Sequence, residues 1–344
     1  MRPSLPDPCD VCGAEVFERW LEVSLCGVSD RWIQRCGACG FRQVRPRLIR
    51  DELTSLYPAD YFDQAEQVGY RDYAREAQRR ARDAYFLAKR IRKHGSATRV
   101  LEVGCALGFL LSPLRDAGCR VDGVDASPFA AYYAQTRFGL PVVCGTLEEA
   151  RFPEGQFDFV VQKDLLEHTL HPRGHLLETR RIMRSGGELW LVTPNGEANV
   201  RPLARGRPTP GTEGSLPLLD QGHLSFFSFS HLKRLFDECG FEVARARAIG
   251  VRRGLRALGV LPGQHRFSHR SRRAVRPPEP GVGADDTSGF DVRATRIETA
   301  VRHHDSWVRR WLPYRYLHRF GKRLDTLPAS VGLGYDFEFV LRKR

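Results

Sequence analysis

The chain has no run of about 18 apolar residues, the length that a membrane-spanning helix needs. Its first residues, Met1 to Ser4, do not begin a signal peptide, so we expect neither a membrane span nor secretion, and we expect a cytoplasmic location. No Gly-Lys-Ser or Gly-Lys-Thr follows its glycine-rich turn, and this absence excludes a phosphate-binding P-loop.

The composition is that of a globular protein with an excess of positive charge. Hydrophobic residues make up 42% and charged residues 28% of the 344 residues, enough for one large domain or two small ones. The net charge of +13 favours an anionic partner, such as a nucleotide sugar, a nucleic acid or lipid headgroups, without choosing among them. Nine cysteines without a secretory signal favour a reducing compartment and metal binding over disulfides.

Four of the cysteines form two C-x-x-C-G turns, Cys9 with Cys12 and Cys36 with Cys39. Two such turns facing each other across a hairpin would supply the four tetrahedral ligands that zinc prefers. Four thiolates close the coordination sphere, so the metal would hold the fold and take no part in chemistry. A redox pair and unligated thiols are the alternatives.

A second pattern lies near residue 100. A short apolar run at 100–103 predicts a buried parallel strand, and Gly104 and Gly108 turn the chain into a helix. Glu102 places an acid at the end of this strand, and Asp125 ends the next apolar strand. An acid about 20 residues after a glycine-rich turn commonly binds a ribose diol, so the pattern predicts a nucleoside site.

The pattern hh-E-h-G-x-(G)-x-G resembles motif I of class I S-adenosylmethionine (SAM) methyltransferases, with Ala106 in place of the usual central glycine. A dinucleotide-binding fingerprint fits poorly, because Ala106 and Leu107 occupy the wrong places, and a turn without any ligand is the plain alternative. The resemblance implies an α/β, Rossmann-like seven-stranded fold with a mixed sheet and an antiparallel last strand.

The resemblance also implies a set of SAM-binding residues. Glu102 would serve the methionine amine through the loop, and Asp125 the ribose hydroxyls. An acid is common where Thr146 stands, so adenine recognition would fall to its hydroxyl, to the Leu147 backbone or to Glu148. The full predicted set is Glu102, Gly104, Ala106, Gly108, Asp125, Ala126, Leu147, Gln162 and Lys163, the last two beside the methionine portion.

The N-terminal half widens the resemblance. The two C-x-x-C-G turns are followed by an E-L-x-x-L-Y helix and a Tyr-Phe pair, which looks like bacterial methyltransferases with an N-terminal zinc-binding segment. Members of that group often act on sugars, surface glycans or other small metabolites. Tyr57 and Tyr61 would line the cofactor pocket, or would only fix the ribbon to the catalytic domain; both interpretations stay open.

The run 160–168 resembles the segment after the motifs of small-molecule methyltransferases, such as those of ubiquinone biosynthesis. His168 is a candidate general base, because an unperturbed imidazole titrates near neutrality; alternatively it starts a helix and bonds to backbone. Glu167 would orient a histidine or a substrate hydroxyl, and His223 lies in a stretch similar to the family's substrate side. The N/D-P-P-Y/F turn of enzymes that methylate base amines is absent.

The expected organisation is a zinc ribbon at 1–45, linker and N-terminal helices over the cofactor pocket at 46–95, a SAM-binding domain at 96–250, an insertion at 251–334 and a last strand at 335–344. The insertion is rich in arginine, partly disordered by composition and partly helical. We expect it to close the substrate cleft or to make a dimer; peripheral membrane contact and a nucleic-acid surface are the alternatives. An oligomer is left open.

These features predict a SAM-dependent methyltransferase that acts on an oxygen, carbon or nitrogen atom of a small metabolite or sugar precursor. One alternative is an RNA methyltransferase with a zinc module, but those modules usually are tighter and end in histidine, so nucleic acid is not the expected partner. The other is a non-catalytic zinc-ribbon binding protein.

Overall fold

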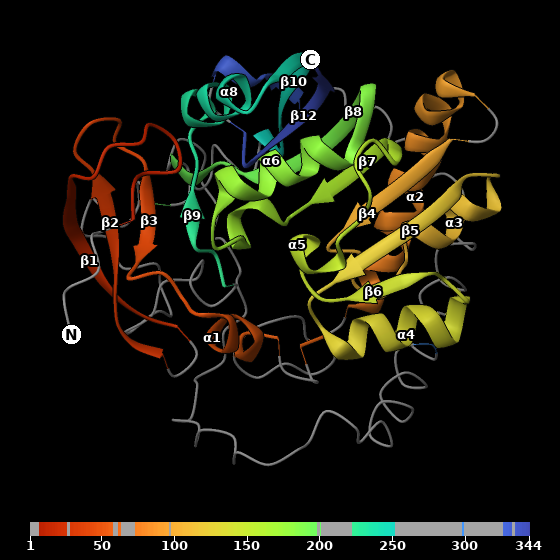
Figure 1. Ribbon diagram of the computed structural model, residues 1–344, viewed down its shortest axis with the longest axis horizontal. Helices are drawn as coiled ribbons and strands as arrows, with labels where there is room; N and C mark the ends of the chain where they lie inside the picture. The colour runs from red at the N-terminus through yellow and green to blue at the C-terminus, as the bar shows by residue number, and fades with distance from the viewer. Residues whose placement is uncertain are drawn as a thin grey trace.

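The computed structural model describes residues 7–25, 28–57, 61–62, 73–95, 98–197, 200, 222–251, 298, 326–331 and 334–344. Within these residues the strands form a four-stranded sheet near the N-terminus and an eight-stranded sheet. The two sheets lie side by side, with the short helix α1 (Arg50–Ser55) between them at the bottom of the view in Figure 1.

The large sheet has the predicted mixed architecture. From one edge its strands are β11 (Thr326–Pro328), β10 (Phe241–Ile249), β12 (Asp336–Lys343), β8 (Met183–Pro194), β7 (Phe157–Lys163), β4 (Arg99–Val103), β5 (Arg120–Asp125) and β6 (Val142–Cys144). The strands from β8 to β6 are parallel, and β12 runs antiparallel between β8 and β10. This order confirms the Rossmann-like fold with an antiparallel last strand. The edge strand β11 is an addition to the seven strands that we predicted.

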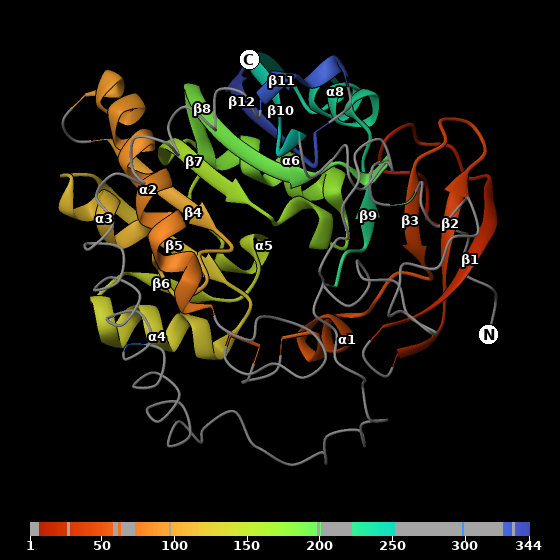
Figure 2. The same cartoon turned by 180° about the vertical axis from the view of Figure 1, so that it is seen from behind.

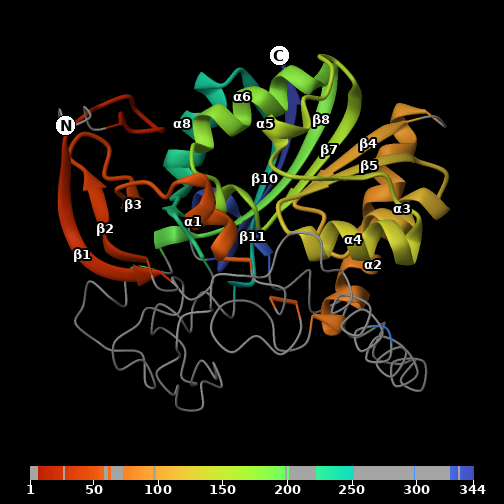
Figure 3. The same cartoon turned by 60° about the horizontal axis from the view of Figure 1, so that its bottom comes forward.

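Helices cover both faces of this sheet, as Figure 3 shows. On one face lie α2 (Ala74–Ile91), the 3-10 turn η1 (Arg92–His94), α3 (Leu111–Asp116) and α4 (Pro128–Phe138); on the other lie α5 (Leu147–Ala150), α6 (Pro172–Ile182) and α8 (Phe229–Glu238). Each face has its own apolar cluster. Val100 and Phe159 point to the α2 side, whereas Leu101 and Val160 point to the α6 side. The central strands are therefore buried on both faces, which explains their continuous apolar sequence.

The small sheet contains a strand from the distant half of the chain. Its order is β1 (Phe17–Leu25), β2 (Val28–Cys36), β3 (Arg42–Arg45) and β9 (Ser225–Phe226). Gln43 lies opposite Ser225 in the register, and its side-chain amide donates to the Ser225 hydroxyl at 3.4 Å. Phe41 stacks on Phe227, with ring centroids 5.1 Å apart. The N-terminal strands β1, β2 and β3 with the two cysteine turns, called the ribbon below, are thus joined through β9 to the segment that carries His223. The view from behind shows the same neighbours (Figure 2).

Most of the predicted insertion, 251–334, lies outside the described residues. The described part contains β11 and the 3-10 turn η4 (Ala329–Val331). The expected cap, dimer and membrane-contact roles of the arginine-rich and helical stretches therefore stay predictions. Among the described helices, none combines the length and the apolar character needed to cross a bilayer.

Candidate functional site

The four cysteines of the two turns converge on one point. Their sulfur atoms lie within 4.8 Å of one another. The Sγ atoms of Cys9 and Cys39 are 3.7 Å apart, and those of Cys12 and Cys36 are 3.5 Å apart. A zinc ion with Zn–S bonds of about 2.3 Å in a tetrahedron separates its sulfurs by about 3.8 Å, so the observed spacing fits this ion. Gly13 and Gly40 adopt positive φ angles of 76° and 78°, as the tight turns require.

The protein environment raises the pKa of some of these thiols and lowers that of another. Burial raises the pKa of Cys9 above its ordinary value and raises that of Cys39 to about 11. Burial also acts on Cys36, but backbone N–H groups of Cys39 and Ala38 outweigh it and lower the pKa to about 7. Backbone donors aimed at sulfur stabilise a thiolate, the form that binds metal.

A cavity of about 1100 Å³ opens at the carboxyl ends of the parallel strands. This volume exceeds that of a typical small-molecule pocket, so it accommodates a nucleoside together with a second small molecule. Most of the predicted site residues line it: Gly104, Ala106, Asp125, Ala126, Leu147, Lys163, Glu167, His168 and His223. Glu102, Gly108 and Gln162 are absent from this lining.

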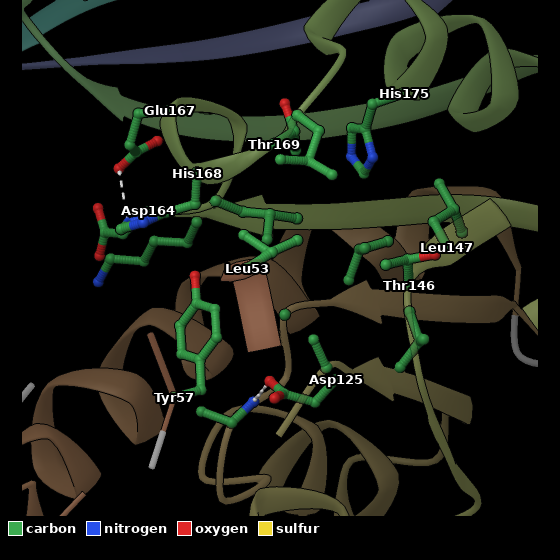
Figure 4. A pocket seen from close by; sticks show the side chains of 18 of the residues that line it. Leu53, Tyr57, Asp125, Thr146, Leu147, Asp164, Glu167, His168, Thr169 and His175 are labelled. Carbon is green, nitrogen blue, oxygen red and sulfur yellow. Dashed lines mark hydrogen bonds and ion pairs between the residues drawn. The ribbon is translucent and has the colours of Figure 1, made fainter. Parts of the chain in front are cut away.

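Asp125 stands at the end of β5 and faces the cavity (Figure 4). Its Oδ2 accepts from the Ala106 N–H at 2.7 Å, and its Oδ1 accepts from the Ser127 N–H at 2.9 Å. Each oxygen keeps a second lone pair for a ligand hydroxyl. Ala106 adopts a φ of 47°, which explains why glycine is usual there, and its bond to Asp125 helps to hold this conformation.

Glu102 lies beneath this loop and is only 2% exposed. Burial raises its pKa to about 8, against the opposing effect of the nearby Arg80. The Glu102 carboxyl is therefore largely protonated at neutral pH. Its predicted contact with a methionine amine would have to run through the loop, because the side chain does not reach the cavity lining.

The side chains of Gln162 and Lys163, at the end of β7, point in different directions. Gln162 is fully buried, and its amide donates to the Thr179 hydroxyl of α6 at 2.8 Å. The Gln162 side chain thus points away from the cavity, because neighbouring strand residues point to opposite faces, and its place beside the methionine portion stays a prediction. Lys163 does reach the cavity, where its ammonium pairs with Asp83 at 2.8 Å.

The adenine end predicted at 146–148 is formed by a short helix. The Thr146 hydroxyl accepts from the Glu149 N–H at 3.3 Å, so it caps α5. Leu147 is buried and lines the cavity beside it. Tyr57 and Tyr61 line the cavity as well, with ring centroids 5.1 Å apart. Tyr57 also packs against both the apolar cluster of the N-terminal sheet and the cluster that contains Tyr61 and Phe62, so both interpretations stay open.

Glu167, His168 and His223 meet at the other end of the cavity. His168 Nδ1 lies 3.0 Å from the Gly222 carbonyl oxygen, so this nitrogen carries the proton and donates. The two imidazole rings are 4.9 Å apart at 83°. Glu167 Oε2 accepts from the Thr193 hydroxyl at 2.9 Å. Figure 4 shows Glu167 and His168 turned toward each other above the hollow that Tyr57 and Asp125 face.

Burial sets the charge of these three groups. It raises the pKa of Glu167 well above its ordinary value, with nearby Asp164 adding to the effect. It lowers the pKa of His168 to about 4 and that of His223 well below its usual range. Both imidazoles are therefore neutral at pH 7 and keep a lone pair each. His168 also has the backbone bond of the alternative interpretation, so the geometry alone leaves its role as a base a prediction.

Two cavity residues, Asp164 and Asp336, were missed from the sequence. Asp164 lines the cavity in a left-handed conformation, with a φ of 55°, and pairs with Arg80 at 3.4 Å. Asp336 reaches the cavity from the start of β12, which lies opposite the end of β8. The only sequence signal was their position, since each polar residue adjoins the end of a predicted strand.

Comparisons with known proteins find methyltransferases among the similar sequences. A curated protein of Mycolicibacterium smegmatis, named a probable S-adenosylmethionine-dependent methyltransferase, is 27% identical over 177 residues, which are 51% of this chain and 64% of that protein. A ubiquinone biosynthesis O-methyltransferase of Pseudomonas aeruginosa is 31% identical over 154 residues, which are 42% of this chain and 65% of that protein. The chain thus covers less than two thirds of either relative.

Solved structures of methyltransferases are also similar to this chain. An S-adenosylmethionine-dependent methyltransferase from Mesorhizobium loti has 11% identity and a TM-score of 0.42, covering 75% of this chain and 97% of that one. A SAM-dependent methyltransferase from Archaeoglobus fulgidus has 15% identity and a TM-score of 0.40, covering 76% and 94%. A family model described as a methyltransferase domain matches residues 70–246, which is more than half of the 344 residues. The chain therefore belongs to this methyltransferase-domain family.

Proposed function

We propose that this chain is a SAM-dependent methyltransferase that acts on an oxygen, carbon or nitrogen atom of a small metabolite or sugar precursor. The observation that carries the proposal is the continuity of one cavity. It extends from Asp125 and the loop at 104–106 to Glu167, His168 and His223. A nucleoside held at the first end would direct a reactive group toward the second end.

The first end suits an adenosyl group. Asp125 is fixed by two backbone N–H groups and has lone pairs to accept from both ribose hydroxyls. The loop at 104–106 lines the same wall and Leu147 offers an apolar surface for a base. Bound SAM supplies an electrophilic methyl on a sulfonium. The chain's contribution is then mostly to align the acceptor with that methyl.

The second end suits a polar acceptor. Neutral His168 and His223 present nitrogen lone pairs beside a buried carboxyl, so a hydroxyl there could lose its proton to an imidazole. The name of the Pseudomonas aeruginosa relative, an O-methyltransferase of ubiquinone biosynthesis, favours oxygen as the acceptor atom. The acceptor in this proposal is a hydroxylated small molecule.

We also propose that the cysteine cluster holds one structural zinc ion. The support is the near-tetrahedral spacing of the four sulfurs, together with the closed set of thiolate ligands. Such an ion would fix the two turns without an open position for chemistry.

The test is methyl transfer from radiolabelled SAM to panels of nucleotide sugars, phenolic metabolites and total RNA. We expect label in one of the small-molecule panels and none in RNA. Transfer to RNA alone would favour the RNA methyltransferase. Calorimetry with SAM and S-adenosylhomocysteine completes the test, because failure of the wild-type chain to bind either would favour the non-catalytic binding protein.

A further inference from the structure

Three side chains at the second end of the cavity, called the acceptor end below, are arranged like the ligands of a metal ion. Glu167, His168 and His223 each offer one ligand atom, and these atoms lie within 4.8 Å of one another. Glu167 and His223 are 1% and 6% exposed, and His168 is mostly buried as well. All three line the cavity, so the space in front of them is open to a bound molecule.

The histidine orientation is that of a metal ligand. His168 donates from Nδ1 to the Gly222 carbonyl, which leaves the Nε2 lone pair on the side of Glu167, 3.9 Å from its Oε1. A metal-bound histidine commonly donates its second nitrogen to a carbonyl in this manner. The perpendicular His223 ring stands against His168, and its own nearest ligand atom completes the set.

An unpaired carboxyl oxygen of Glu167 also favours a bound cation. Its Oε2 is fixed by Thr193, but within the described residues its buried Oε1 has no hydrogen-bond partner. A buried carboxyl oxygen without a partner is costly, and the atoms facing it here are imidazole nitrogens rather than donors from the backbone. A cation between them would satisfy this oxygen and both nitrogen lone pairs together.

The backbone holds this arrangement in place. The Leu224 N–H donates to the Glu167 carbonyl at 2.8 Å, which ties the segment of His223 to that of His168. The Leu224 carbonyl in turn accepts from the Val44 N–H of β3 at 2.8 Å. The three side chains therefore lie on two segments that backbone hydrogen bonds join to each other and to the ribbon.

We propose that Glu167, His168 and His223 bind a divalent transition-metal cation that contacts the methyl acceptor. Two imidazoles and one carboxylate, with remaining positions open to the cavity, suit first-row ions such as Mn²⁺, Fe²⁺ or Zn²⁺ better than Ca²⁺ or Mg²⁺. This inference rests on the proposed function for its role, although the binding of the ion does not. The site is separate from the cysteine cluster, which has four thiol ligands of its own.

The role of the ion follows from its charge. With the ion bound, the lone pairs of both imidazoles are on the metal, so an acceptor hydroxyl in an open position would lose its proton to solvent instead of to an imidazole. The cation favours this loss because it stabilises the resulting oxygen anion. That oxygen then forms a bond to the methyl carbon, the carbon–sulfur bond breaks, and its electron pair stays on sulfur as a thioether. Atoms and charge balance without an oxidant or a reductant.

The experiment uses the full-length, zinc-loaded chain and Mn²⁺ as the probe, because hard Mn²⁺ competes poorly for four thiolates. Calorimetry should show one Mn²⁺ per chain, and pulsed electron paramagnetic resonance should show coupling to imidazole nitrogen. We expect the Kd for Mn²⁺ to rise at least about tenfold in Glu167→Gln and in His223→Gln, in line with loss of one ligand. His171→Gln, an exposed cavity residue outside the cluster, should leave the Kd unchanged.

Absence of Mn²⁺ binding by the wild-type chain, an unchanged Kd in His223→Gln, or bound Mn²⁺ without nitrogen coupling would overturn the inference. S-adenosylhomocysteine binding is measured in the same samples. Wild-type chain that binds this nucleoside but no Mn²⁺ defeats only the metal site, whereas chain that binds Mn²⁺ but no nucleoside defeats only the proposed function. Retained nucleoside binding by His223→Gln also shows that this variant is folded.

Discussion

Among single residues, Asp125 is the one on which nucleoside binding should depend most. The Ala106 and Ser127 N–H groups orient its carboxylate before any ligand arrives, but burial still raises its pKa to about 6. A raised pKa in an acid means that the ionised form, the better acceptor for ribose hydroxyls, is present above pH 6 and is lost as the pH falls through that value.

We therefore predict that the affinity for S-adenosylhomocysteine falls about tenfold between pH 7.5 and pH 5, because roughly a tenth of Asp125 stays ionised one unit below its pKa. Glu102, with a pKa of about 8, stays mostly protonated over this range. Calorimetry at both pH values measures the effect. Asp125→Asn should bind weakly with a flat profile, and Asp122→Asn on the same strand should behave as wild type. Equal wild-type affinities at the two pH values would contradict the assignment.

Gly108 has a packing role as well as a conformational one. It adopts a φ of +78°, and a Cβ there would lie 2.6 Å from Leu140 Cδ1 and 3.2 Å from Ala134 Cβ. Gly118 has a similarly positive φ of +94°, but nothing lies within 4 Å of a Cβ placed on it. The pair therefore separates backbone strain from steric overlap.

Gly118→Ala should lower the free energy of unfolding by about 1–2 kcal/mol through backbone strain alone. Gly108→Ala should cost a further ~1–3 kcal/mol, because the new methyl overpacks the contact between the loop and α4. Urea unfolding of both variants measures the two values. If they lose the same stability, the close approach of the loop to α4 is not what requires glycine at 108.

At the scale of elements, the short strand β9 connects the ribbon to the acceptor end of the cavity. Its neighbour α8 adds a second link, since His231 Nε2 lies 3.0 Å from the Cys39 carbonyl oxygen. Arg173 of α6 adds a third, donating to the carbonyls of Asp10 and Val11 beside the first cysteine turn. The cysteine turns thus support the segments that follow His223 and His168.

Loss of the ribbon metal should therefore loosen the acceptor end more than the nucleoside end. In Cys36→Ser we expect loss of zinc and at least about tenfold faster amide exchange in β9, residues 225–226, because this strand pairs with β3 of the ribbon. Hydrogen exchange with mass spectrometry measures this, and metal analysis measures the zinc. Cys144→Ser, at an exposed thiol outside the cluster, is the matched control. Retained protection at 225–226 after zinc loss would refute the connection.

Elements with a local signal could be predicted from the sequence, and elements without one could not. The apolar run at 100–103 predicted strand β4, which the structure places at Arg99–Val103, because a central parallel strand is buried on both faces. The two-residue strand β9 has no period to detect, and its partner Gln43 lies 182 residues from Ser225. Gln162 and Lys163 were predicted together beside the methionine portion, but strand alternation turns them apart: Lys163 lines the cavity and Gln162 bonds to Thr179 of α6.

The cavity is a property of the whole molecule. The sheet supplies Asp125 and Lys163, the linker supplies Tyr57 and Tyr61, and the segment joined to the ribbon supplies His223. Each wall was recognisable by its motif, but their meeting around one space of about 1100 Å³ depends on side-chain packing between segments distant in the sequence. The substrate class stays a proposal for this reason, since an acceptor is selected by the combined walls.

The most direct test of the central claim is a crystal structure of the full chain with S-adenosylhomocysteine. We predict that both ribose hydroxyls donate to Asp125 and that the sulfur faces the space bounded by Glu167 and His168. A nucleoside bound elsewhere, or bound at 104–125 with its sulfur turned away from that space, would contradict the proposed methyl transfer.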